Sequence, residues 1–193
     1  MPSESERMVA LTIARRYPEA YIRYLAEYYG SRDFFECHEI MEEYWKEQAH
    51  DPIATCWLVL IRIPVALYHA RRGNRGGALK LLAKAIGEID GAPFRELNID
   101  GAELKTRLKE LHRRWSESAE IVYEDLDLPI DDAALLEAAK AKSLSLGYGW
   151  GTGGLDAPDA IVHRHKLRDR SDVVEAREAS AKRKALSRST PNK

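Results

Sequence analysis

The chain has 193 residues, of which 45% are hydrophobic and 32% are charged, and its formal net charge at pH 7 is −1. This length is enough for one sizeable hydrophobic core, and the composition excludes a wholly disordered chain and a fibrous repeat. We therefore expect one globular domain flanked by tails.

The apolar segments are too short to cross a membrane. The longest apolar run, residues 56–61, ends at Arg62, whereas a membrane-spanning helix needs roughly 20 apolar residues. Residues 3–7 are polar and do not fit a signal peptide. We expect no membrane contact and a cytoplasmic location, with Cys37 and Cys56 as buried, reduced thiols.

Residues 8–17 can form a helical turn or two, and Pro18 then fits the first turn of a longer helix that ends at Gly30. Four tyrosines recur at helical spacing and predict core packing: Tyr17, Tyr21, Tyr24 and Tyr28. A second helix is predicted to begin at Asp33, which forms an acidic version of the capping box with Glu36.

The next helix, residues 55–72, is apolar almost all round, which suits the middle of a bundle. We expect a kink before Pro64, because proline removes one backbone donor and crowds the preceding turn. The short connection over residues 49–52 makes this helix an antiparallel neighbour of the one before it. Further helices are predicted after the caps Asn74 and Asp100, and over residues 132–146.

The predicted fold class is all-α. We expect a compact bundle of about five to seven helices with a central antiparallel hairpin and a basic C-terminal tail. The helical domain is predicted over residues 18–146, after an N-terminal extension over residues 1–17. Glycines are frequent over residues 147–154 and predict a linker within the segment 147–193.

The tail differs from the rest of the chain in charge. Residues 163–193 contain ten basic and four acidic residues, which leaves 20 basic and 27 acidic residues in 1–162. We expect the tail to be disordered or transiently helical. A solvated tail is the plainer interpretation, and a weak contact of residues 163–193 with nucleic acid or another acidic partner is the alternative.

The helix after Asp33 carries the candidate site. At ~100° per residue, His38 falls on its apolar face and Glu42 lies at the edge of that face. The same face holds Phe34, Met41 and Trp45. Four other glutamates fall on the opposite face and are expected to be solvated: Glu36, Glu39, Glu43 and Glu47.

A family resemblance rests on these residues. His38, Glu42, Trp45 and His69 reproduce the spacing HxxxExxW followed by a later histidine. Together with the flanking stretches FFECHEIMEEYW and ALYHARRGNRGGALKLL, they resemble the prokaryotic family called domain of unknown function 309 over residues 28–89. The resemblance implies a helical fold and metal ligands at the two histidines and the glutamate, and it implies no activity.

Known catalytic patterns fit the motif poorly. The zincin pattern HExxH requires a second histidine where this chain has Glu42, and di-iron bundles require repeated ExxH pairs. Cys37 and His38 point ~100° apart on a helix, which does not suit a nucleophile and its base.

A mononuclear site built from His38, Glu42 and His69 is the better hypothesis. These ligands suit zinc and leave a position open for water, so one expected function is a small metal-dependent hydrolase. At ~1.5 Å per residue, the two histidines are offset along the hairpin by about one helical turn. We expect the kink at Pro64 and the long side chains to close this gap.

Arg62 supports two other interpretations. Because it shares a stripe with His69, Arg62 can pair with Glu42 while the histidines form hydrogen bonds within a polar network, or it can bind an anion. The function would then be that of a non-catalytic binding or scaffold protein whose partner is an unknown small molecule or protein. In either case the residues expected to line the site are Phe34, Trp45, Arg62 and Tyr68.

Overall fold

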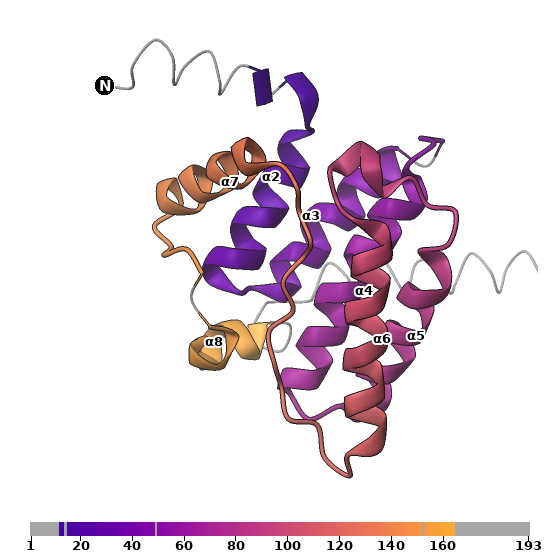
Figure 1. Cartoon of the computed structure of the whole chain (residues 1–193). Coiled ribbons are helices and arrows are strands. Elements are labelled where there is room, and N and C mark those ends of the chain that lie inside the picture. Colours follow the sequence, from indigo (N-terminus) through magenta and orange to yellow (C-terminus); the bar gives the residue numbers. More distant parts are fainter. Residues whose placement is uncertain (1–11, 14, 49, 152, 165–193) are drawn as a thin grey trace, which may run out of the picture. The chain divides into compact units, whose positions relative to one another are not determined.

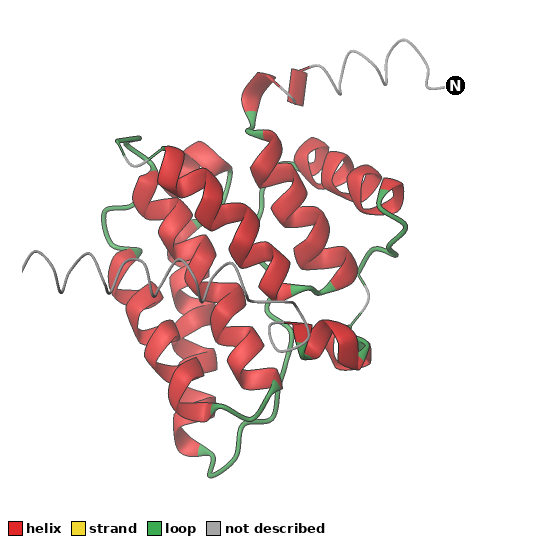
Figure 2. Ribbon diagram, turned by 180° about the vertical axis from the view of Figure 1, so that it is seen from behind, coloured by secondary structure: helices red, strands yellow, loops and turns green. Residues whose placement is uncertain are grey.

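The computed structural model describes residues 12–13, 15–48, 50–151 and 153–164, which divide into one unit that ends at Val162 and a second that begins at His163. Regular secondary structure in the described residues is helical, as the colouring in Figure 2 shows, and the all-α prediction is confirmed. The α-helices are α2 (Glu19–Ala26), α3 (Phe34–Glu47), α4 (Ala54–Arg71), α5 (Arg75–Glu88), α6 (Gly101–Glu117), α7 (Ala133–Ser145) and α8 (Asp159–Val162).

Three turns of other helix types complete the described elements: the π turn η1 (Glu27–Ser31) and the 3₁₀ turns η2 (Phe94–Leu97) and η3 (Gly154–Asp156). The described residues contain no strand, and one isolated antiparallel bridge joins Ile99 to Ile130. None of the described helices combines the length and the hydrophobicity needed to cross a membrane.

Helix α4 lies at the centre of the bundle, between α3 and α5 (Figure 1). Helix α6 packs against α5, α2 packs against α3, and α7 packs against α2. The Tyr44 ring lies 5.4 Å from that of Trp57, and the Phe35 ring lies 6.3 Å from that of Tyr68. The start of α3 therefore faces the end of α4, which confirms the predicted antiparallel hairpin.

Side-chain caps explain where four of the described helices begin. Asp33, Asn74, Asp100 and Asp132 each accept a hydrogen bond from a backbone N–H in the first turn of α3, α5, α6 and α7. Such caps satisfy amides that have no partner within the helix. All four predicted helix starts are confirmed, because a cap is a local signal.

The end of α2 differs from its prediction. The α-helix stops at Ala26 instead of continuing to Gly30, and the π turn η1 follows it. Arg32 then adopts a left-handed φ of 54°. Gly30 is in close contact with α7, because a Cβ at Gly30 would lie 2.0 Å from the Ser143 Oγ. The absence of a side chain at Gly30 therefore lets η1 pack against α7.

Helix α4 contributes more buried residues than any other described helix, and it continues as one helix through Pro64. Trp57, Leu60, Ile63 and Leu67 are all fully buried. Because both flanking helices cover it, α4 needs no polar face, in agreement with its almost uniformly apolar sequence.

Residues on both sides of the predicted helical domain, 18–146, contact the bundle. Tyr17 is 2% exposed, and its hydroxyl donates to Asp132 Oδ2 at 2.7 Å, so the bundle begins before Pro18. The expected linker also packs on the bundle: the Gly151 N–H donates to the Tyr29 carbonyl at 2.9 Å, and the Trp150 ring lies 5.2 Å from that of Tyr29. Residues 165–193 lie outside the described residues, and the character of the tail stays a prediction.

Gly30→Ala should destabilise the protein. The new methyl group would overlap the Ser143 hydroxyl, and overpacking of this kind costs roughly 1–3 kcal/mol. In a chain of this size that cost lowers the melting temperature by roughly 2–10 °C.

Thermal unfolding followed by circular dichroism measures this effect, with Gly87→Ala as the matched control. A Cβ at Gly87 meets nothing within 4 Å, and alanine is the better helix former there. The control should melt at or slightly above the temperature of the unaltered protein. Equal melting temperatures for both variants would contradict the packing of η1 on α7.

Ending the chain after Leu146 should lower the melting temperature by roughly 5–15 °C, because it removes several hydrogen bonds and the Trp150 contact, worth roughly 2–4 kcal/mol together. Ending it after Val162 retains these contacts and serves as the control. Identical melting curves for the two shortened proteins would show that residues 147–162 add nothing to the fold.

Candidate functional site

A histidine and two carboxylates meet on α3 beside α4. His38 Nδ1 lies 3.0 Å from Glu39 Oε1, and His38 Nε2 lies 3.9 Å from Glu42 Oε2. All three side chains are half-buried, and one ligand atom from each lies within 4.8 Å of the others. In the described part of the chain, no other group of three or more His, Cys, Asp or Glu residues is close enough to share a metal ion.

Glu39 determines which imidazole nitrogen is available. A carboxylate accepts a hydrogen bond, so the proton of the neutral ring lies on Nδ1, and Nε2 keeps its lone pair. That lone pair and Glu42 Oε2 are then two acceptors 3.9 Å apart. Two ligands ~2.0–2.2 Å from one tetrahedral ion lie ~3.3–3.6 Å apart, so a small side-chain movement brings both acceptors onto one ion. Metal-bound histidines commonly donate their other N–H to a carboxylate, as His38 does here. The residues therefore fit a divalent ion.

A hollow of about 240 Å³ opens beside the cluster, between α3, α4 and α5. It is mostly apolar, with polar side chains from α3 and α4. Its lining residues are His38, Glu42, Trp45, Leu58, Ile61, Arg62, Val65 and Leu81. Because His38 and Glu42 line the hollow, an ion held between them borders this space.

His69, the third predicted ligand, is not part of the cluster. Its Nδ1 lies 2.9 Å from Asn74 Nδ2, at the turn between α4 and α5. A row of rings separates it from His38: Phe35 lies 6.3 Å from His38 and 6.3 Å from Tyr68, and Tyr68 lies 6.2 Å from His69. The one-turn offset expected from the sequence is therefore not closed in the structure, where α4 is continuous through its proline.

Arg62 does not pair with Glu42. Its Nε and Nη2 donate to the two carboxylate oxygens of Glu88 on α5, at 2.5 and 2.6 Å. Glu42 instead lies 3.2 Å from Lys46 Nζ, one turn along α3. The alternative with a Glu42–Arg62 pair is thus wrong about the partner, although both residues line the same hollow.

The other predicted lining residues divide into two groups. Trp45 lines the hollow, whereas Phe34 is fully buried beneath the Arg71 guanidinium, 4.6 Å from its ring centroid. Tyr68 packs in the row of rings and not in the hollow.

Sequence reasoning missed Glu39, which it assigned to the solvent face. The backbone does direct Glu39 away from the apolar face, but its flexible stem brings the carboxylate back to the neighbouring imidazole. In the sequence, the one signal for this contact is that Glu39 directly follows His38.

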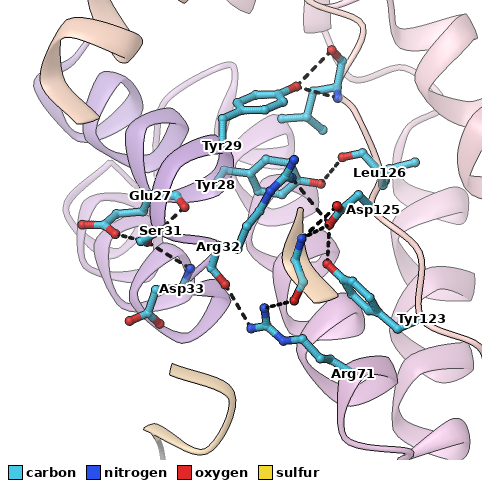
Figure 3. A network of polar contacts seen from close by, with 12 residues as sticks. Glu27, Tyr28, Tyr29, Ser31, Arg32, Asp33, Arg71, Tyr123, Asp125 and Leu126 are labelled. Atoms are coloured by element: carbon cyan, nitrogen blue, oxygen red, sulfur yellow. Dashed lines mark hydrogen bonds and ion pairs between the residues drawn. The ribbon is translucent and has the colours of Figure 1, made fainter. Parts of the chain in front are cut away.

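A second polar cluster lies where α4 ends (Figure 3). Arg71 donates to the backbone carbonyls of Arg32, at 3.0 Å, and Gly154, at 3.4 Å. Asp125 accepts hydrogen bonds from the Tyr123 hydroxyl, at 2.6 Å, and from the Gly154 N–H, at 2.9 Å. Sequence reasoning gave no indication of this cluster. Because it joins α4, η1 and η3 through backbone atoms, we interpret it as structural.

His69 should make the fold sensitive to acid. Burial, and then the charge of Arg72, lower the pKa of His69 below its ordinary value. Asn74 Oδ1 accepts from the Gly77 N–H, so its Nδ2 donates to His69 Nδ1, and a proton on that nitrogen would break the bond. As pH falls, the unfolded chain takes up this proton before the folded chain does. The contribution of neutral His69 to the free energy of unfolding is therefore fully present above about pH 6.5, and it is lost as pH falls through the folded pKa.

Melting temperatures between about pH 5 and about pH 8 test this expectation. His69→Gln should lose part of the acid sensitivity because glutamine does not titrate, whereas His50→Gln, at an exposed position, should keep it. Parallel pH profiles for the unaltered protein and the His69→Gln variant would contradict it.

Comparison with known proteins places the chain in a family. A family model described as "Domain of unknown function (DUF309)" matches residues 21–81. The uncharacterized protein YpuF of Bacillus subtilis (strain 168) is 39% identical over 176 residues, which cover 89% of this chain and 99% of that protein. An uncharacterized protein of Aquifex aeolicus (strain VF5) is 30% identical over 85 residues, 43% of this chain and 25% of that protein. No solved structure gives a significant match. The chain belongs to the DUF309 family, as its motif indicated.

Proposed function

We propose that this protein binds a divalent metal ion, with zinc favoured, between His38 Nε2 and the Glu42 carboxylate. The observation that carries the proposal is the position of Glu39 on the opposite imidazole nitrogen, which leaves two acceptors 3.9 Å apart at the edge of a hollow. Imidazole and carboxylate together suit a borderline ion such as zinc. His69 is not required as a ligand in this arrangement.

Two protein ligands leave most coordination positions of the ion to water or to a bound molecule. Structural zinc sites use four protein ligands, so this site is of the open kind. An ion with open positions can polarise a substrate or lower the pKa of a bound water, and the hollow offers space beside it. We therefore propose a small metal-dependent hydrolase as the activity to test first.

A second candidate is a non-catalytic binding or scaffold protein in which the same residues form a structural network. Lys46 Nζ, 3.2 Å from Glu42 Oε2, favours this candidate because it already supplies a positive charge. A protonated His38 can likewise donate to both Glu39 and Glu42. The two candidates share one geometry and differ in whether a metal ion binds.

Calorimetric titration of metal-free protein with zinc distinguishes the two candidates. His38→Ala and Glu42→Gln should each abolish binding, and Glu39→Gln should weaken it by roughly 10–100-fold, because an orienting carboxylate is lost. Glu43→Gln, an exposed glutamate on the same helix, is the matched control and should bind zinc unchanged. Affinity should also fall in acid, where protons compete for Nε2.

No binding heat from a protein with an intact helical spectrum would leave the structural network as the better account. Equal zinc affinity in Glu39→Gln, Glu42→Gln and Glu43→Gln would also contradict the proposal, since it would place the ion elsewhere.

A further inference from the structure

The hollow beside the metal site is small and mostly apolar. Leu58, Ile61 and Val65 of α4, Leu81 of α5 and Trp45 of α3 supply its apolar lining. Its volume of about 240 Å³ is below the ~300–1,000 Å³ of pockets for drug-sized ligands. At ~30 Å³ for each water-sized group, it holds about eight non-hydrogen atoms. A nucleotide or a dinucleotide cofactor does not fit within it.

The register of α3 and α4 gives the hollow two unlike ends. Tyr44 faces Trp57 and Phe35 faces Tyr68, so residues of the two antiparallel helices meet at matching heights. Along the helix axes, the same register places Leu58 level with Trp45. It places Arg62 at a level between those of His38 and Glu42. The end formed by Trp45 and Leu58 is therefore apolar, and the other end carries Arg62 and the candidate ligands beside Ile61 and Val65.

Arg62 is fixed at this polar end. Its bidentate pair with Glu88 engages two of the five N–H donors of the guanidinium and holds its orientation. The Arg62 side chain is only 19% exposed, so solvent screens its charge less than that of a surface arginine. An anion entering the hollow meets this group without any rearrangement of the side chain.

Metal binding changes the charge of the polar end. Without an ion, the negative charges of Glu39, Glu42 and Glu88 outnumber the positive charges of Arg62 and Lys46. A divalent ion reverses this balance, and the polar end then attracts anions. Ion and anion should therefore strengthen each other's binding, because such coupling is reciprocal.

Building on the proposed function, we infer that the hollow binds a small aliphatic carboxylate. The volume of the hollow, at ~30 Å³ per water-sized group, sets the size of this ligand at about eight non-hydrogen atoms. The carboxylate lies at the polar end, against Arg62 and the ion. The hydrocarbon body lies against Trp45, Leu58 and Ile61. Branched or straight chains of this length fill the space, whereas a neutral compound of the same shape lacks the anchoring charge.

The experiment uses 4-methylpentanoate and its neutral amide, 4-methylpentanamide, as probes. Binding to the full chain is followed through the indole N–H signal of Trp45 in ¹⁵N-labelled protein, assigned with Trp45→Phe. Zinc-loaded and chelator-treated samples are compared. We expect the acid to bind the zinc-loaded protein at least about tenfold more tightly than the amide, because a hydrogen bond to a charged group is among the stronger ones. Zinc should raise the affinity for the acid.

Three variants locate the binding. Arg62→Gln should weaken acid binding by about tenfold or more while leaving amide binding nearly unchanged. Val65→Phe fills the hollow without altering any charge, and it should abolish the response to both probes. Arg113→Gln, at an exposed arginine on α6, is the control and should change neither.

The outcomes separate this inference from the proposed function. Zinc binding with no response of Trp45 to the acid would overturn the inference and leave the metal site intact. Equal affinity for acid and amide would also overturn it. Acid binding that depends on Arg62 in a protein that takes up no zinc would support the ligand class and reject the metal site.

Discussion

The packing of α4 against α3 depends on the contacts of one side chain, the guanidinium of Arg71. Arg71 is the last residue of α4. It lies over the Phe34 ring and donates to the carbonyls of Arg32 and Gly154. Each carbonyl also accepts a backbone N–H, from Phe34 at 3.1 Å and from Ala157 at 3.4 Å, and Arg71 adds a charged donor, which makes the stronger kind of hydrogen bond. Arg71 thus fixes the end of α4 against the start of α3.

That anchor sets the α3–α4 register, and the register determines the composition of the candidate site. It brings Arg62 to the height of His38 and Glu42 and leaves His69 beyond the rings of Phe35 and Tyr68. The motif residues consequently serve two purposes. His38 and Glu42 of α3 lie together with Glu39 beside the hollow, whereas His69 forms a hydrogen bond with Asn74 at the turn into α5.

How much could be predicted from the sequence depends on the range of each interaction. Helix starts and the antiparallel hairpin were predictable, because caps and short connections act within a few residues. The π turn was not, since it depends on Gly30 meeting Ser143 more than a hundred residues away. The glycines after Gly147 suggested a linker, but Gly154 is a close-packing residue, where a Cβ would lie 2.2 Å from the Tyr123 hydroxyl.

At the site, residue type and helical face identified His38 and Glu42 but not their companions. Glu39 belongs to the cluster because its flexible side chain reaches His38, although its Cβ points away from the apolar face. His69 does not belong to it, because its ring forms a hydrogen bond with nearby Asn74. Both outcomes depend on rotamers, on which a helical wheel carries no information.

Anomalous diffraction at the zinc absorption edge, from crystals grown with zinc, tests the metal site most directly. We expect one strong peak ~2.0–2.2 Å from His38 Nε2 and from a Glu42 carboxylate oxygen, with Glu39 still bonded to Nδ1. A peak at His69, or zinc bound only away from α3, would contradict it.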